Sequence, residues 1–338
     1  MRKDTLRQPA RIMPTSKPSR ITQKKTPQPG SAQARTQAPS AFEKALHEMR
    51  HQPPSAFPNI SARWLLKAFA VTVGAIVVLT WLALCLLYWQ GSWQLLYHPK
   101  AVITRTPASA GLAYEPVRFA VTETGTTKLT GWWMPAPSEN ASRFTVLYLH
   151  GADGNLSDTV DTQAALHKAG LAVFAIDYRG YGQSQPARPS EKRLYQDVES
   201  AMTWLTGMRQ IPAKNIVVFG SSLGANLATE LAAEHSDLAG IILDQPVQTP
   251  LNAVFADPRS RLVPAHWLVH DRYDLTAAAA ALRTPSLWLL AKSDPAQPAQ
   301  LPAEYKAVPG KKSSAWMESP ASADAHFAET MHRWLDDL

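Results

Sequence analysis

Cysteine is almost absent from this chain. Its 338 residues include a single cysteine, Cys85, so no disulfide bond can form within the chain. No group of His, Cys, Asp and Glu residues has the spacing of a metal site, and no glycine-rich loop has the pattern that binds phosphate. We therefore expect neither a metal ion nor any other cofactor.

Positive charge is scarce outside the N-terminal segment. The whole chain has 34 Lys and Arg against 27 Asp and Glu, a net charge of +7. Residues 1–63 contain 12 of the basic and 3 of the acidic residues, a net of +9, which leaves 22 and 24, a net of −2, for the remainder. Nucleic-acid-binding domains carry a basic patch or stripe. The C-terminal part has no such excess, and we expect no nucleic-acid partner.

Residues 1–63 also contain few large apolar side chains. They are rich in Pro, Gln, Ser, Thr, Lys and Arg. Such a segment buries too little apolar surface to offset the entropy lost on folding. We interpret it as a disordered, solvated tether in the cytoplasm, with a short helix over residues 41–51.

Charged residues are missing altogether from residues 68–89. At a rise of 1.5 Å per residue, this run is long enough to cross a hydrocarbon core of about 30 Å. Aromatic residues mark its two ends, with Trp64 on one side and Trp89 and Trp93 on the other. The run is too long, and too far from the N-terminus, for a cleaved signal peptide. We predict a transmembrane helix over residues 64–90.

The charge distribution predicts how this helix is oriented. Basic segments next to a membrane span remain in the cytoplasm. The basic tail therefore predicts a cytoplasmic N-terminus and places the C-terminal part on the other side of the membrane. We expect a single-pass protein of a bacterial inner membrane with a periplasmic domain; in a eukaryote, the domain would face a lumen or the cell exterior.

After a connector over residues 91–111, the pattern becomes that of a folded domain over residues 112–338. Its first elements are two antiparallel strands, residues 116–122 and 129–134, joined by a turn at residues 123–125. Apolar runs then alternate with helical stretches, which indicates a mainly parallel sheet with helices on both faces, the α/β class. The apolar runs are residues 144–149, 171–176, 215–219, 240–243 and 286–290, with a weaker one near 313–317.

A G-x-S-x-G motif occupies residues 220–224, between a buried strand and a helix. Residues 216–219 are β-branched or aromatic, and residues 225–235 are mostly good helix formers. At a strand-to-helix turn this motif is the nucleophile elbow, which exposes a serine on a tight, strained turn. Ser222 is therefore the candidate nucleophile.

A second glycine-containing loop, residues 150–155, directly follows the strand over residues 144–149. Backbone N–H groups in such a loop are held in place, so they stabilise a developing oxyanion well. We interpret the loop as part of an oxyanion hole. Residues 177–184 follow the next strand, and we assign them mainly to structure near the site.

These segments resemble a known family. The chain resembles membrane-anchored α/β-hydrolases, in particular the single-pass, bud-emergence-like serine hydrolases, which are related to depalmitoylating hydrolases and serine-aminopeptidase-type lipases. The similarity covers residues 93–338, and its segments have the order found in that family. The matching segments are residues 96–99, 129–135, 150–155, 177–184 with 189–191, and 220–224.

The resemblance implies a catalytic triad in the chain order serine, acid, histidine. It implies backbone N–H groups of Leu223 and Ala152 as the oxyanion hole. Asp294, after the strand over residues 286–290, fits the position of the acid, and Asp244 is the alternative.

The histidine of the triad is expected just before the last helix. His326 has that position, whereas His332 lies within the helix and is expected to face solvent. Imidazole accepts the serine proton and returns it to the leaving group, because its pKa lies near neutrality.

We therefore predict a serine hydrolase that cleaves a carboxylic ester or thioester through an acyl-enzyme, with a small or lipid-like substrate because the enzyme is tethered to a membrane. A peptidase or amidase on the same triad, and an inactive hydrolase fold used as a binding module, are the alternatives. Small helices are expected over residues 246–283. Their large apolar side chains either line an acyl pocket or pack on the sheet: Phe255, Leu262, Trp267 and Leu268.

Overall fold

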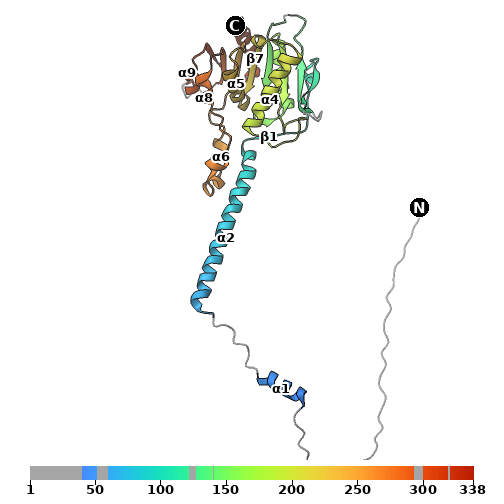
Figure 1. The fold of residues 1–338 in the computed structure, drawn as a ribbon. Coiled ribbons are helices and arrows are strands. Elements are labelled where there is room, and N and C mark those ends of the chain that lie inside the picture. Colours follow the sequence, from blue (N-terminus) through green and yellow to red (C-terminus); the bar gives the residue numbers. More distant parts are fainter. Residues whose placement is uncertain (1–39, 52–59, 122–126, 140, 293–299, 319) are drawn as a thin grey trace, which may run out of the picture. The chain divides into compact units, whose positions relative to one another are not determined.

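The computed structural model describes residues 40–51, 60–121, 127–139, 141–292, 300–318 and 320–338 (Figure 1). The chain divides into two compact units, residues 1–67 and residues 68–338. In the first unit, helix α1 spans Ala41–His51, as the sequence predicts. The helix begins with a capping box, in which the Glu43 N–H donates to Ser40 Oγ over 3.2 Å and the Ser40 N–H donates to Glu43 Oε2 over 3.3 Å.

Helix α2, Ala62–Gly91, contains the uncharged run and ends in a short 3-10 helix, η1, Ser92–Leu95. Among the described residues, the helical stretch over residues 62–95 has the length and composition needed to cross a membrane. Only 6% of its most apolar part is buried. A core helix of a soluble domain buries one face. Most of α2 exposes its apolar side chains instead.

Eight strands form one sheet in the order β10-β9-β8-β7-β4-β6-β3-β2. Strand β3 runs antiparallel to both of its neighbours, β2 and β6, and the other neighbouring pairs are parallel. This confirms the predicted fold, a mainly parallel sheet that opens with an antiparallel pair. The turn predicted at residues 123–125 lies outside the described residues. The strands are β2 Glu115–Val121, β3 Thr127–Met134, β4 Thr145–Leu149, β6 Ala172–Asp177, β7 Ile216–Ser221, β8 Gly240–Asp244, β9 Ser286–Ala291 and β10 Lys312–Met317.

The register of the central strands places matching side chains on each face of the sheet. Leu147 of β4 lies opposite Phe174 of β6 and Val218 of β7, and all three belong to one buried cluster. Because side chains alternate along a strand, the residues before them face a second cluster: Val146, Val173 and Val217. The central strands are thus buried on both faces, as in other sheets covered by helices on both sides.

Helices cover both of these faces (Figure 1). On the face of Leu147 lie α4 Glu191–Thr203, α5 Leu223–Glu234 and α8 Leu275–Ala281. On the face of Val146 lie α3 Val160–Lys168 and α10 Phe327–Asp336. Helix α4 continues into a π-helical segment, Trp204–Met208, and α5 is the helix predicted after the G-x-S-x-G motif.

Small helices connect β8 to β9, as expected. They are α6 Asn252–Ala256, η6 Pro258–Arg261 and α7 Ala265–Leu268, followed by α8. Phe255 stacks on His266 with ring centroids 4.2 Å apart, but Leu262 and Trp267 are exposed. The expectation that these side chains pack on the sheet is therefore wrong for Leu262 and Trp267.

Candidate active site

The G-x-S-x-G segment forms a sharp turn from β7 into α5. Ser222 has φ 52° and ψ −117°, a strained conformation for a residue with a side chain. A Cβ added at Gly220 would lie 2.3 Å from the Gly224 carbonyl oxygen, and one at Gly224 would lie 2.2 Å from the carbonyl oxygen of Leu149. Because neither contact is sterically possible, glycine is required at both positions. The turn has the geometry of a nucleophile elbow.

The loop over residues 150–155 lies directly against the candidate nucleophile. A Cβ added at Gly151 would be 3.2 Å from Ser222 Cβ and 3.6 Å from its Oγ. Leu223 opens α5, so its N–H belongs to the first turn, where N–H groups have no acceptor within the helix. The positive end of the α5 dipole also lies at this turn. The serine, the loop of Ala152 and the helix N-terminus are thus brought together.

The predicted connector is hydrogen-bonded to this loop. Two of its residues form strand β1, His98–Pro99, which pairs in parallel with β5, Asp153–Gly154. The Ala152 carbonyl accepts hydrogen bonds from the His98 N–H over 3.0 Å and from Tyr181 Oη over 2.8 Å. The sequence did not predict this pairing, although residues 96–99 were among the segments that carry the family resemblance. The connector therefore fixes the backbone on which the candidate oxyanion donor lies.

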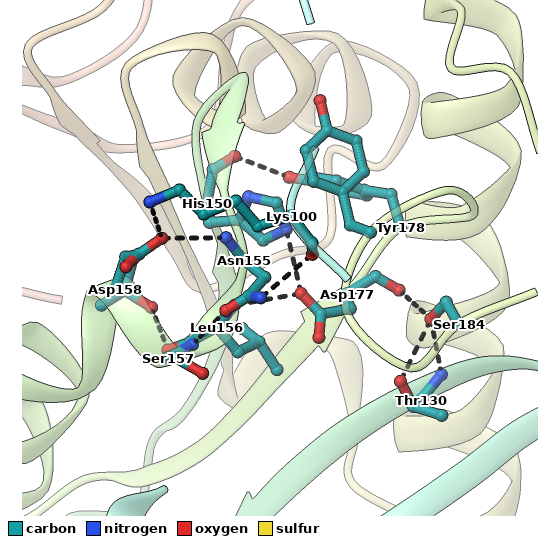
Figure 2. A network of polar contacts seen from close by, with 12 residues as sticks. Lys100, Thr130, His150, Asn155, Leu156, Ser157, Asp158, Asp177, Tyr178 and Ser184 are labelled. Atoms are coloured by element: carbon teal, nitrogen blue, oxygen red, sulfur yellow. Dashed lines mark hydrogen bonds and ion pairs between the residues drawn. The ribbon is translucent and has the colours of Figure 1, made fainter. Parts of the chain in front are cut away.

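Figure 2 shows the polar contacts on the other side of the same loop. Asn155 Oδ1 accepts from the Ser157 N–H over 2.8 Å, and its Nδ2 donates to the Lys100 carbonyl over 3.0 Å. Asn155 and Asp158 form a capping box on the 3-10 helix η3, Leu156–Thr159. The end of the loop is thus anchored both to the connector and to the helix that follows.

Asp177, at the end of β6, holds the loop from beneath (Figure 2). Its Oδ1 accepts from the Leu156 N–H over 3.0 Å and lies 3.5 Å from His150 Nε2. Its carbonyl accepts from Ser184 Oγ over 2.6 Å, and Ser184 Oγ in turn accepts from the Thr130 N–H over 2.9 Å. These contacts support the structural role predicted for residues 177–184.

His150 is buried in this network. It is 1% exposed, and its Nδ1 lies 2.8 Å from the Gly151 carbonyl oxygen. The rings of Tyr178 and Tyr181 pack on it with centroids 4.5 Å and 5.0 Å away. The side chain therefore packs between the loop and the two tyrosine rings.

Asp244, the alternative acid, lies at the end of β8 beside the turn. Its Oδ2 accepts from Ser221 Oγ over 3.0 Å, and its carbonyl accepts from the Ser222 N–H over 2.8 Å. Among the contacts of the described residues, none joins Asp244 to His326. Burial raises the pKa of Asp244 to about 6. The structure places this carboxyl under the elbow and gives it no contact with the candidate base.

The raised pKa of Asp244 has a consequence for stability. Between its unfolded pKa of about 3.9 and its folded pKa of about 6, the unfolded chain releases this proton while the folded chain retains it. Rising pH therefore favours unfolding in this range. We expect the Asp244→Asn variant to remove a decline in the free energy of unfolding on the order of 2 kcal/mol between pH 4 and 6, measured by urea denaturation. Replacing the exposed Asp237 by asparagine should leave that decline in place.

His326 stands at the N-cap of α10, just before the last helix, as predicted. Its side chain is 74% exposed, and its Nδ1 lies 3.3 Å from Asp324 Oδ1. The next residue, Phe327, packs on Phe219 of β7 with ring centroids 6.4 Å apart, which brings the start of α10 to the strand that carries the elbow. Within the described part of the chain, no hydrogen bond joins His326 to Ser222.

Asp324 is the carboxylate next to this histidine, and the sequence had assigned it no role. Its Oδ1 accepts from the His326 N–H over 2.9 Å, and its Oδ2 accepts from Lys292 Nζ over 2.8 Å and from the Glu318 N–H over 3.0 Å. The hydrogen bond from Lys292 holds the pKa of Asp324 well below its usual range. Asp294, the predicted acid, lies outside the described residues. In the sequence, this contact is indicated by the position of Asp324 two residues before His326.

Comparison with known proteins agrees with this geometry. The fold resembles that of an esterase from Pyrococcus furiosus, with a TM-score of 0.53 over 72% of this chain and 97% of that chain at 19% identity. The molecule thus has the α/β-hydrolase fold. Residues 140–308 match the serine aminopeptidase, S33 family, and the chain belongs to that family.

Two sequence relatives extend the comparison. An uncharacterised protein of Mycobacterium tuberculosis is 34% identical over 258 residues, which cover 73% of this chain and 89% of that protein. The human alpha/beta hydrolase domain-containing protein 17C is 34% identical over 125 residues, 37% of this chain and 36% of that protein. Together, family and fold define a serine hydrolase of the α/β-hydrolase superfamily.

Proposed function

We propose that the chain is a membrane-anchored serine hydrolase that cleaves a carboxylic ester or thioester, with Ser222 as its nucleophile. One observation carries this proposal: Ser222 stands at φ 52° on a turn that only glycines permit on either side, with the Gly151 backbone packed against its side chain. Strain of this kind persists in proteins mainly where it serves a function. A serine used only for structure would not need it.

In the proposed reaction, Ser222 Oγ attacks the substrate carbonyl carbon while His326 accepts the hydroxyl proton. The N–H groups of Leu223 and Ala152 stabilise the negative oxygen of the tetrahedral intermediate. His326 then returns the proton to the departing alcohol or thiol, which leaves an acyl-enzyme. Water, deprotonated by the same imidazole, attacks the acyl carbon, and the imidazolium then protonates Ser222 Oγ as the acid leaves.

We propose Asp294 as the carboxylate that orients His326. It follows β9 by three residues, the position that the resemblance implies for the acid. The competing carboxylate, Asp324, already accepts hydrogen bonds from Lys292, Glu318 and the His326 backbone. Its contact with the His326 ring, at 3.3 Å, is long for a bond that must hold an imidazolium.

We further propose that α2 anchors the enzyme in a bacterial inner membrane. In this arrangement residues 1–63 are a cytoplasmic tail, residues 64–90 span the bilayer, residues 91–111 connect, and residues 112–338 form the periplasmic hydrolase domain. The uncharged run of 22 residues over 68–89 and the net charge of +9 over residues 1–63 support the span and its orientation.

A fluorophosphonate probe that cannot cross membranes tests both parts of this proposal. Such a probe phosphonylates an activated serine with loss of fluoride. In a bacterial expression host, we expect the full chain to be labelled in intact spheroplasts as strongly as in lysed cells. Labelling in lysate alone would contradict the periplasmic orientation. If a folded chain resisted labelling in both samples, the hydrolase assignment would fail and the fold would serve as a binding module.

The name of the S33 family makes an amide-cleaving enzyme the second candidate. Amide hydrolysis demands protonation of a poor leaving group, so it depends more on the general acid than ester hydrolysis does. With purified protein, we expect p-nitrophenyl esters and acyl thioesters to be cleaved with higher kcat/KM than aminoacyl p-nitroanilides. The opposite ranking would favour the peptidase.

A further inference from the structure

Residues 251–268, which lie between β8 and α8 and contain α6, η6 and α7, expose large apolar side chains. We call them the cap segment. Downstream of residue 95, the described large hydrophobic residues that are exposed are Val102, Met208, Leu262 and Trp267. Two of these four lie in the cap segment, with Leu262 61% and Trp267 84% exposed. Single exposed apolar residues are common on folded domains, whereas a group of them on one segment marks a candidate interaction site.

The cap segment is hydrogen-bonded to helix α2. Trp81 Nε1 donates to the Leu262 carbonyl over 3.1 Å, and Tyr88 Oη donates to the Val254 carbonyl over 3.0 Å. A cavity of about 170 Å³ between the two segments is lined by leucines of α2 and by residues of the cap segment, including Leu262 and Val263. Figure 1 shows α6 beside α2. The cap segment therefore lies alongside the apolar helix.

The position of Trp81 gives the depth of this contact. Trp81 lies inside the uncharged run over residues 68–89, eight residues before Trp89. At 1.5 Å per residue, it is about 12 Å along the helix from that end. Half of a hydrocarbon core measures about 15 Å. If Trp89 marks the outer boundary of the span, Leu262 lies at the depth of the acyl chains.

The polar groups of the cap segment are compatible with a position among the lipid acyl chains. An indole N–H and a backbone carbonyl that lie in lipid both need partners, and Trp81 and Leu262 provide them for each other. Arg259 is neutralised by Asp257, which accepts from its Nε over 2.8 Å and from its Nη2 over 2.9 Å. Arg261 has a long side chain of the kind that reaches back to phosphate headgroups.

We propose that the cap segment inserts into the extracytoplasmic leaflet of the bilayer, with Leu262 and Trp267 in contact with lipid acyl chains. The inference rests on the proposed membrane anchor, since α2 sets the depth. The partner of this surface is a lipid bilayer. The cap segment belongs to the connection between β8 and β9. The end of β8 contacts the elbow through the hydrogen bond from Ser221 to Asp244. The inserted surface is therefore joined by the chain to the end of the sheet at which Ser222 lies.

Depth-dependent fluorescence tests the inference on the full chain. Cys85 is the only cysteine, so Cys85→Ser provides a background for single labelling sites. Leu262→Cys, Trp267→Cys and, as the matched control, Met208→Cys are labelled with the dye NBD and reconstituted into phosphatidylcholine vesicles. Met208 is an exposed apolar residue outside the cap segment. Retained fluorophosphonate labelling shows that each variant is folded.

We expect NBD at positions 262 and 267 to emit at shorter wavelength than at 208, to be quenched by doxyl-labelled lipids and to be protected from aqueous iodide. Iodide quenching at 262 and 267 equal to that at 208 would overturn the inference. Flotation of the same vesicles separates the two proposals. A chain that does not float with lipid contradicts the anchor, whereas a chain that floats with water-exposed dyes at 262 and 267 contradicts insertion alone.

Discussion

Replacing Ser222 by alanine is expected to lower kcat/KM for p-nitrophenyl esters by about 10⁴- to 10⁶-fold and to abolish fluorophosphonate labelling. The acyl-enzyme cannot form without the hydroxyl, and only stabilisation by the surrounding N–H groups remains. The fold should be unaffected, since alanine occupies the backbone conformation at φ 52° at a cost similar to that of serine. Activity is measured in steady state, and folding is checked by thermal unfolding.

The neighbouring serine provides a matched control. Ser221 carries a hydroxyl one residue away, and its Oγ donates to Asp244 rather than facing the Gly151 loop. We expect Ser221→Ala to keep labelling and to change kcat/KM by less than about tenfold, the size of a positioning effect. If both variants lost kcat/KM equally, the loss would reflect a disturbed turn and not the removal of the Ser222 hydroxyl.

The second large loss of activity is expected from replacing His326, the proposed general base. His326→Ala should lower kcat by about 10⁴- to 10⁶-fold, because the serine then has no group that takes its proton. His332→Ala is the control, since His332 is exposed on the same helix six residues later. If His332→Ala caused the larger loss, the order of the triad would have to be revised. Both are measured with the same ester as the serine variants.

The acid is identified by a matched pair of variants. Asp294→Asn is expected to lower kcat by about 10³- to 10⁴-fold, since an amide neither fixes the tautomer of the imidazole nor stabilises its charged form. Asp324→Asn weakens the bond to Lys292 and should lower the melting temperature while changing kcat far less. The reverse pattern would make Asp324 the acid of the triad.

The sheet was predictable because its signals are local. Each strand from β4 to β10 in the large sheet was predicted from an apolar run, and residues 313–317, the weakest of these runs, form β10 beside β9. The elbow was predictable for a related reason, since two glycines at fixed spacing are required by contacts within a few residues of chain and with β4. Ser222 could thus be singled out from residues 216–235 alone.

The features that escaped prediction depend on distant partners. Strand β1 has two residues and pairs with β5, 55 positions later, so it is too short for a periodic pattern in the sequence to predict it. The contact of Asp324 with His326 depends on where a loop places one side chain. Leu262 was expected at a pocket or on the sheet, and its actual neighbour, α2, precedes it by more than 160 residues. Long-range packing decided each case.

The pairing of β1 with β5 determines where a soluble version of this enzyme can start. A chain trimmed at residue 112, the first residue of the predicted domain, would lack His98 and with it one of the two donors that hold the Ala152 carbonyl. It would also lose Tyr97, whose hydroxyl lies 2.6 Å from that of Tyr273 in the domain interior. Protein engineers who remove the anchor should therefore cut upstream of Tyr97. In a shorter product the loop over residues 150–155 would be held less firmly, and a low turnover could then be mistaken for the wrong choice of substrate.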